Sequence, residues 1–254
     1  MSASFASASC ARANSEPADG RPLRLARYLA HSGVASRRRA EELVQAGRVA
    51  VGGRTVTDPA LAVDEGAEVQ VDGQAVEPEE REVWMVNKPA HVVSTAREPG
   101  RRRAVVELVP SRRRLYPVGR LDADSTGLVL LTNDGDLANR LTHPRYEVPR
   151  TYRVKLRRPA SESQLRRLRR GVELEDGTTA PARARRLSLR EIELTIREGR
   201  NRQVRRMLAA VGNEVASLQR VRFASLRLGS LAEGSARRLS SAELAKLWKD
   251  AGRD

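Results

Sequence analysis

The sequence predicts an α+β protein made of two modules: a small N-terminal αα-β module and a larger one with a mainly antiparallel mixed sheet flanked by helices. A chain of 254 residues, 40% of them hydrophobic, can form one large or two modest domains with real cores. Segments typical of strands and helices do not alternate strictly, which favours an α+β over a doubly wound fold. The acidic, proline-containing stretch 77–82 is typical of a linker and separates the two modules.

The first module, residues 21–80, is expected to contain two helices followed by short strands. Apolar residues recur at helical spacing from Leu23 to Ala30, and Ser32-Gly33 ends this helix. A second helix begins at Ser36, a favourable N-cap, and ends at Gly47. Strand-like pieces separated by turn signals follow at residues 49–51, 55–56 and 68–71.

The second module, residues 83–250, mixes both element types. Ser240 and Glu243 have the spacing of a capping box and predict the start of its last helix. Strands are expected at 83–87, 127–132, 152–156, 192–197 and 216–221, and helices at 161–170, 201–211 and 240–249.

Charge indicates the kind of partner. The chain has 47 Lys+Arg against 32 Asp+Glu, a formal charge of +15, and 43 of the cations are Arg. Such an excess favours a polyanionic partner, since cations neutralise phosphates and release counterions. The net charge is +5 over residues 21–48, −7 over 49–80 and +18 over 81–254. This change of sign suggests one face for binding and another for solubility.

Several classes of protein lack their usual residues here. The single cysteine, Cys10, excludes a disulfide scaffold, and three scattered histidines give little basis for a metal site. No Gly-rich nucleotide loop, esterase elbow or zinc-protease motif is present, so we expect no metal and no small-molecule cofactor. No stretch of 18 residues is free of charge, so we expect no membrane span and a cytoplasmic location. Residues 1–20 are Ala/Ser-rich without an apolar segment and are expected to form a disordered tail.

One segment differs from an ordinary solvated turn. Residues 119–135 form a polar loop with two carboxylates, Asp122 and Asp124, followed by an apolar strand and a turn at Asn133-Asp134-Gly135. A loop anchored by a buried strand can present a reactive group. Asp124 at i+2 would share a face with Asp122 on an extended strand, as in a two-carboxylate glycosidase, but the basic charge of this module fits a polyanion better.

Taken with three other motifs and the N-terminal module, this loop resembles the pseudouridine synthases of the RsuA/RluB type, ribosomal-RNA enzymes with an S4 RNA-binding domain before the catalytic domain. The resemblance runs from about residue 21 to 249. Residues 27–30, 33–38 and 47–49 resemble an S4 domain. The catalytic motifs are matched in order by residues 87–89, 119–135, 151–154 and 198–207.

The resemblance implies roles for particular residues. Asp122 matches the nucleophilic aspartate, Arg205 the arginine paired with it, and Tyr152 the tyrosine that stacks on the target base. Arg120 matches a position implicated in filling the space that a flipped-out uridine leaves. An arginine beside a buried carboxylate favours its ionised form, which desolvation alone would disfavour. The residues that we expect to bind RNA are Arg24, Arg27, Arg37, Arg38, Arg48, Arg120 and Arg202.

The implied function is that of an isomerase that converts a specific uridine of ribosomal RNA to pseudouridine. The sequences of the motifs resemble more closely the branch of the family that acts on the large subunit. We expect a monomer. Two alternatives stay open: a non-catalytic RNA-binding or ribosome-assembly factor on the same scaffold, and a DNA-binding helix-turn-helix regulator. One residue departs from the family pattern, since His91 stands where the family usually has glycine after Lys88-Pro89. If that position needs a positive φ, histidine is less favourable there.

Overall fold

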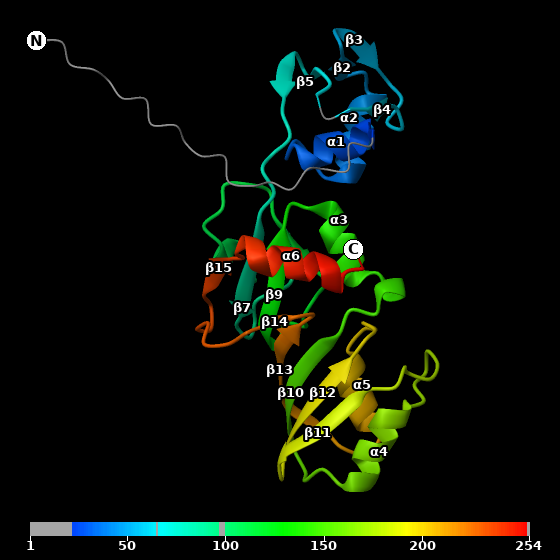
Figure 1. The fold of residues 1–254 in the computed structure, drawn as a ribbon, viewed down its shortest axis with the longest axis vertical. Coiled ribbons are helices and arrows are strands. Elements are labelled where there is room, and N and C mark those ends of the chain that lie inside the picture. Colours follow the sequence, from blue (N-terminus) through cyan, green and yellow to red (C-terminus); the bar gives the residue numbers. More distant parts are fainter. Residues whose placement is uncertain (1–21, 65, 97–99, 253–254) are drawn as a thin grey trace, which may run out of the picture. The chain divides into compact units, whose positions relative to one another are not determined.

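The chain divides into two units, one ending at Arg81 and the other beginning at Glu82. The computed structural model describes residues 22–64, 66–96 and 100–252 (Figure 1). The tail expected at residues 1–20 lies outside the described residues. Each unit has its own hydrophobic core.

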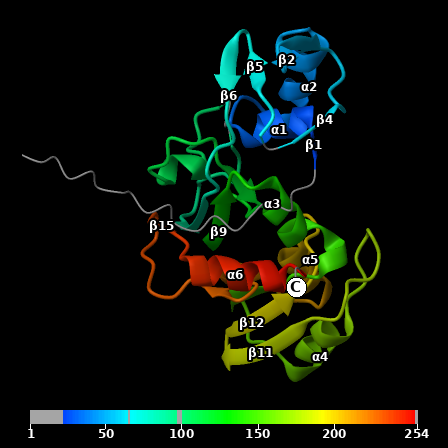
Figure 2. The same ribbon diagram turned by 45° about the horizontal axis from the view of Figure 1, so that its top comes forward.

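The N-terminal unit contains the predicted αα-β arrangement. Figure 2 shows its two helices beside the strand pair β5 and β6. Leu25, Leu29 and Val44 are fully buried between helices and sheet, as the helical spacing of the apolar residues predicts. Ser36 caps the second helix by accepting a hydrogen bond from the Arg39 amide at 3.3 Å. The elements are β1 (Leu23–Arg24), α1 (Leu25–His31), α2 (Arg37–Gln45), β2 (Val49–Val51), β3 (Arg54–Val56), β4 (Ala62–Val63), β5 (Val69–Val71) and β6 (Gln74–Val76).

The C-terminal unit is built on a nine-stranded sheet with the order β11-β12-β10-β13-β9-β7-β15, to which β14 and β8 add at β13 and β9. All pairs are antiparallel except β9 with β13, so the predicted α+β class is confirmed. The elements are β7 (Val83–Lys88), η1 (Val105–Leu108), β8 (Tyr116–Val118), β9 (Thr126–Thr132), α3 (Gly135–Thr142), η2 (Pro144–Tyr146), β10 (Arg150–Leu156), α4 (Glu162–Arg170), β11 (Arg183–Ser188), β12 (Glu191–Ile196), α5 (Gln203–Ala210), β13 (Val215–Phe223), β14 (Leu226–Arg227), β15 (Ala236–Arg238) and α6 (Ser241–Asp250).

Both faces of strand β9 are buried. Leu128 and Leu130 pack on one face with residues of α3 and α6, whereas Val129 and Leu131 pack on the other face. The second core also contains residues of α4 and α5. A strand covered on both faces needs a continuous apolar run, which explains the uninterrupted sequence 128–131.

The turn expected at Asn133-Asp134-Gly135 is instead the start of helix α3. The Asp134 carboxylate accepts hydrogen bonds from the amides of Asp136 and Leu137, at 3.0 and 3.1 Å, and so caps the helix. Aspartate followed by glycine is compatible with either a turn or an N-cap, and here the buried Leu137 and Leu141 decide for the helix. The short strands β1, β4, β6, β8, β11, β14 and β15 were also not predicted.

Candidate active site

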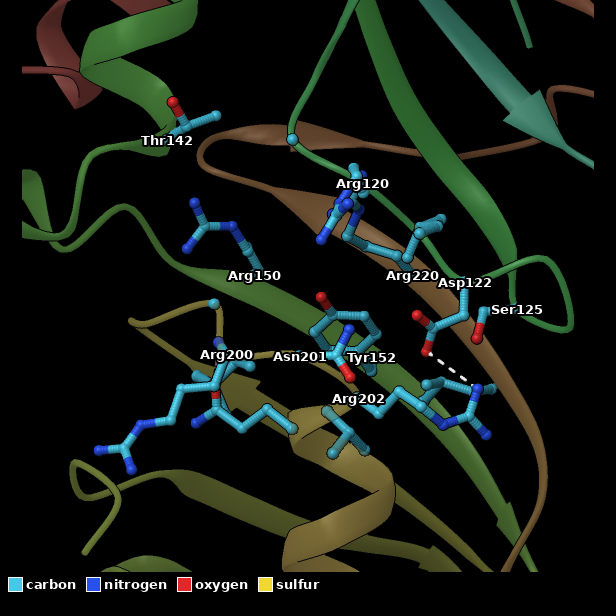
Figure 3. A pocket seen from close by; sticks show the side chains of 17 residues that line it. Arg120, Asp122, Ser125, Thr142, Arg150, Tyr152, Arg200, Asn201, Arg202 and Arg220 are labelled. Atoms are coloured by element: carbon cyan, nitrogen blue, oxygen red, sulfur yellow. Dashed lines mark hydrogen bonds and ion pairs between the residues drawn. The ribbon is translucent and has the colours of Figure 1, made fainter. Parts of the chain in front are cut away.

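A cavity of about 240 Å³ opens in the C-terminal unit and brings together segments that are far apart in sequence (Figure 3). It is lined by the loop 119–122, by strands β10 and β13, and by the loop 199–204 before and into α5. Of the expected catalytic residues, Asp122 and Tyr152 line it, and so do Arg120 and Arg202 from the expected RNA-binding set. The volume is below the roughly 300–1,000 Å³ typical of drug-sized ligand sites, so it suits one nucleotide rather than a length of polynucleotide.

The loop that carries Asp122 is held at several points. The Ser125 amide donates to the Asp122 carbonyl at 3.0 Å, which closes a tight turn before β9 begins. Ser94 bonds both the amide and the carbonyl of Leu121, at 3.1 and 3.0 Å. The His91 amide donates to the Ala123 carbonyl at 2.7 Å. A loop fixed in this way presents its carboxylate in one orientation.

Lys88, at the end of β7, connects the loop that carries Asp122 with the segment 89–92 through hydrogen bonds of its side chain. Its side chain is fully buried, and its Nζ donates to the carbonyls of Pro89 and Val92, both at 2.8 Å, and to that of Ala123 at 3.5 Å. Burial lowers the pKa of Lys88 from its ordinary 10.5 to about 8, and the nearby charges of Asp124 and Asp122 oppose this shift. Lys88, which belongs to the segment 87–89, is therefore a buried cation beside the loop that carries Asp122.

His91 has φ of +66°, so the position does require the left-handed conformation that the family fills with glycine. Its side chain is exposed. The departure from the family pattern therefore leaves the loop geometry intact, at the cost of a strained backbone at this residue.

Strand β9 approaches β13 so closely that a glycine is required at their crossing. Gly127 has φ of +103°, and a Cβ atom placed there would lie 2.3 Å from the carbonyl oxygen of Arg220. Gly127 pairs with Arg220 in the one parallel ladder found among the described residues. The end of the loop that carries Asp122 is thereby fixed against β13, and residues of β13 line part of the cavity.

Two carboxylates and two guanidinium groups form a network at one end of the cavity. Arg202 Nη1 lies 3.7 Å from Asp122 Oδ2, and its Nη2 lies 3.4 Å from Asp124 Oδ2. Arg205 Nη2 lies 3.0 Å from Asp124 Oδ2. Asp122 is the more buried carboxylate, with 29% of its side chain exposed against 47% for Asp124.

This geometry differs from the expected direct pair of Arg205 with Asp122. Among the described residues, the ion pair of Arg205 is with Asp124, and the guanidinium within 4.0 Å of Asp122 is that of Arg202. The turn closed by Ser125 is the physical reason, because it places Asp122 and Asp124 in a bend rather than along an extended strand. Arg205 is 17% exposed, and it does not line the cavity.

Tyr152 lies on β10 and is 7% exposed. Figure 3 shows its ring between Asp122 on one side and Arg150 on the other. Directly across the ladder from Tyr152 lies Arg220 of β13. Arg220 is buried, its Nε donates to the Leu128 carbonyl at 2.6 Å, and its Nη2 has no partner. Burial lowers the pKa of Arg220, and the electrostatic interaction with the Tyr152 side chain opposes this.

Arg150 and Arg220 are site residues that the sequence analysis missed. Arg150 precedes Tyr152 by two positions on β10, so strand alternation places both side chains on one face, and this signal could have found it. No comparable pattern marks Arg220, whose neighbourhood depends on the order of strands in the sheet.

The loop 198–203 is fixed by a clamp around Arg200. Its guanidinium donates to the carbonyls of Asp176, Gly177 and Thr178, at 3.0, 2.7 and 2.7 Å, and to the Glu198 carboxylate at 3.2 Å. These bonds hold the start of α5, where Arg202 has φ of +47°. The clamp therefore sets the direction in which Arg202 reaches Asp122.

Comparison with known proteins shows the family of this chain. The family model described as RNA pseudouridylate synthase matches residues 82–210, and the S4 domain model matches residues 23–69. The chain belongs to the RNA pseudouridylate synthase family. It is therefore an isomerase of the class that converts uridine to pseudouridine in RNA.

Named relatives span nearly the whole chain. The ribosomal large subunit pseudouridine synthase B of Bacillus subtilis is 46% identical over 231 residues, which are 88% of this chain and 95% of that protein. The dual-specificity RNA pseudouridine synthase RluF of Escherichia coli is 35% identical over 232 residues, covering 89% and 79%. A crystal structure of a pseudouridylate synthase aligns with a TM-score of 0.66 and 32% identity, covering 89% of this chain and 99% of that one.

The arginines expected to bind RNA in the S4 domain occupy different environments. Arg24, Arg37 and Arg38 are exposed at the starts of α1 and α2, and Arg27 is half-buried on α1. Arg48 is exposed but bonded to Asp72 through both carboxylate oxygens, and this contact raises the pKa of Arg48. An arginine already paired with a carboxylate has less to gain from a phosphate than a free one.

The described part of the chain contains neither a candidate membrane span nor a candidate metal cluster. None of the helices there has the length and apolar character of a membrane-crossing segment. Nor do three or more His, Cys, Asp or Glu side chains meet there in a group that could hold a metal ion.

Proposed function

We propose that this protein converts one specific uridine of large-subunit ribosomal RNA to pseudouridine and that Asp122 is the nucleophile. The observation that carries the proposal is the position of the Asp122 carboxylate in a nucleotide-sized cavity beside Tyr152. The choice of RNA rests on the similarity to the Bacillus subtilis enzyme, whose name specifies the large ribosomal subunit.

The reaction breaks the N1–C1′ bond of uridine and joins C1′ to C5 of the same base. N1 gains a proton and C5 loses one, so atoms and electrons balance without an external oxidant or reductant. The step needs a group that attacks the uridine and a pocket in which the detached base can turn. Asp122 supplies the first and the cavity the second. Attack at C1′ and attack on the base are both compatible with this arrangement.

Two cations lie near Asp122. Arg202 lies 3.7 Å from it, and Lys88 sits beneath the same loop. Tyr152 lines the cavity and offers an aromatic surface on which a flipped uracil can stack, and we assign to its hydroxyl a role in removing the C5 proton. The flipped uridine leaves its RNA stack at a cost of a few kcal/mol, which contacts inside the cavity must offset. We assign Arg120, at the exposed edge of the cavity, to the space that the uridine vacates.

Arg205 acts indirectly in this proposal. It holds Asp124, and Asp124 shares Arg202 with Asp122, so loss of Arg205 would change where Arg202 lies. RNA outside the cavity would be bound by the arginines of the S4 domain, through phosphate contacts. We also propose that the protein works as a monomer and in the cytoplasm, where its relatives' ribosomal substrates are made.

The test is Asp122→Asn with a large-subunit rRNA transcript as substrate. Loss of a nucleophile lowers catalysis on the order of 10⁴-fold or more, whereas RNA affinity should stay within about threefold. Pseudouridine is read by primer extension after carbodiimide treatment. Asp136→Asn on α3, outside the cavity lining, is the matched control and should stay active. Pseudouridine formed by Asp122→Asn at the wild-type rate would refute the assignment, and no product from the wild type on any rRNA would favour a non-catalytic assembly factor.

A further inference from the structure

One end of the cavity holds cations that have no carboxylate partner. Five arginines line the cavity, and two of them are neutralised: Arg200 by Asp176 and Glu198, and Arg202 by Asp122 and Asp124. Within the described parts of the chain, no ion pair with a carboxylate is formed by the other three, which are Arg120, Arg150 and Arg220. Of these three, Arg150 lies on the side of Tyr152 away from Asp122 (Figure 3).

At this end of the cavity, several contacts fix the position of Arg150. It is 9% exposed, and its guanidinium donates to the carbonyls of Leu141 at 3.0 Å and Val148 at 3.4 Å. It also lies 5.4 Å from the centre of the Phe223 ring. Neutral carbonyls and a ring orient the group but do not cancel its charge. A guanidinium has five N–H donors, and these two bonds leave others free toward the cavity.

A second buried cation increases the need for an anion. Arg220 lies 5.1 Å from the centre of the Phe223 ring, which Arg150 also approaches. Burial lowers the pKa of Arg150, Tyr152 opposes this, and the charge of Arg220 adds to the lowering. Two like charges held together away from water are costly unless a negative group joins them. Because both line a cavity open to ligands, the missing negative group can be supplied by the substrate.

We propose that Arg150 binds a phosphate group attached to the ribose of the target uridine, and that Arg120 at the rim adds to this binding in a free nucleotide, where there is no vacated RNA stack for it to fill. This inference rests on the proposed function, because it takes Asp122 as the end of the cavity where C1′ reacts. With uracil on Tyr152 and the ribose toward Asp122, a phosphate next to that ribose would reach the guanidinium end. The planar fork of arginine fits phosphate oxygens, and a contact in a partly dry cavity is stronger than one on the surface.

The subsite would draw the nucleotide in by its backbone while leaving the base free to turn. During the reaction the base detaches, whereas the ribose and its phosphate keep their bonds to the RNA chain. Binding of the phosphate by Arg150 therefore keeps C1′ near Asp122 through the whole reaction.

The test compares binding of uridine with binding of its 3′- and 5′-monophosphates by NMR titration of the full-length protein. For the wild type we expect at least one monophosphate to bind about tenfold more tightly than uridine at low salt, with the difference shrinking as salt increases. Arg150→Met should remove most of this preference and leave uridine affinity within about twofold. Arg150→Lys keeps the charge without the fork and should retain part of the preference.

Two further variants keep the outcome decisive. Arg120→Met changes an exposed residue without a described partner, so it should fold normally and lower the preference partly even if Arg150→Met proves unstable. Arg166→Met, an exposed arginine of α4 outside the cavity, is the matched control and should keep the full preference. Asp122→Asn should also keep it, so a failed nucleophile assignment and a failed subsite give different results. Equal binding of all three ligands by the wild type, or an undiminished preference in folded Arg150→Met, would overturn the proposal.

Discussion

The burial of Lys88 predicts how the free energy of unfolding changes with pH, in both magnitude and sign. Lys88 is the buried lysine beneath the loop that carries Asp122, and burial lowers its pKa from 10.5 to about 8. In the unfolded chain the same amine is solvated and keeps its ordinary pKa. Between pH 8 and pH 10.5 the unfolded state therefore holds a proton that the folded state has lost.

The free energy of unfolding should rise with pH across that window, because stability increases wherever the unfolded state binds more protons. A pKa lowered from 10.5 to about 8 corresponds to about 3 kcal/mol. The buried charge destabilises the fold by this amount below pH 8, and the penalty disappears above pH 10.5. Hydrogen bonds from Nζ to the carbonyls of Pro89 and Val92 offset part of it at neutral pH.

Lys88→Met removes the titrating group, so the informative quantity is the unfolding free energy of the wild type minus that of the variant. We expect this difference to increase by about 3 kcal/mol from pH 7 to pH 10.5. Urea unfolding followed by circular dichroism at several pH values measures it. Lys155→Met is the control, since Lys155 is exposed on β10, and it reports the effect of removing a solvated lysine under the same conditions.

A difference that stays flat with pH, or that follows the Lys155→Met control, would show that Lys88 is hydrated in the folded protein. A difference that falls with pH would mean that the carboxylates of Asp122 and Asp124 outweigh burial and raise the pKa of Lys88. Either result would refute the account of a dry cation beneath the loop.

Two substitutions test the backbone geometry that shapes the same loop. Gly127→Ala should destabilise the protein by about 3 kcal/mol or more, because its Cβ would collide with the backbone of Arg220, whereas Gly229→Ala, at φ of +60° with nothing within 4 Å of a Cβ, should cost only about 1 kcal/mol in urea unfolding. Equal losses would contradict the close crossing of β9 and β13. His91→Gly should stabilise by about 0.5–1 kcal/mol, since relief of the strain at φ of +66° exceeds the entropy that glycine adds to the unfolded chain. His91→Ala keeps the strain and should not stabilise, and a gain of the same size in both would point to the imidazole instead.

Much of the fold could be predicted because local signals and burial agree. The helix that begins at Ser240 and the strands around the apolar run 128–131 were expected, and the structure contains both. The short strand β11 could not be found in this way. Its sequence is dominated by exposed arginine and has no apolar alternation of its own. It forms a strand because it pairs with β12, and the segment's own sequence does not reveal that pairing.

The candidate site divides in the same manner. Asp122 and Tyr152 were expected from their motifs and do line one cavity. The partner of Arg205 was not predictable, because a bend of four residues decides which carboxylate faces α5. Arg220 comes into the site through the parallel crossing of β9 and β13, which joins positions 93 residues apart in the pair Gly127–Arg220. Such long-range pairings are set by sheet topology, which no local pattern encodes.

The two carboxylates of the loop have different ion-pair geometry, and this difference suits the proposed reaction. Among the described residues, Asp124 contacts two guanidinium groups, at 3.0 and 3.4 Å, whereas Asp122 has a single one at 3.7 Å. A carboxylate held tightly by two cations is a weak nucleophile, since its lone pairs are engaged in charge-assisted hydrogen bonds. Asp122 keeps a positive charge nearby, yet its oxygens are not bound closely by it. By taking the short contacts of Arg205 and part of Arg202, Asp124 leaves the oxygens of Asp122, the proposed nucleophile, without a close ion pair among the described residues.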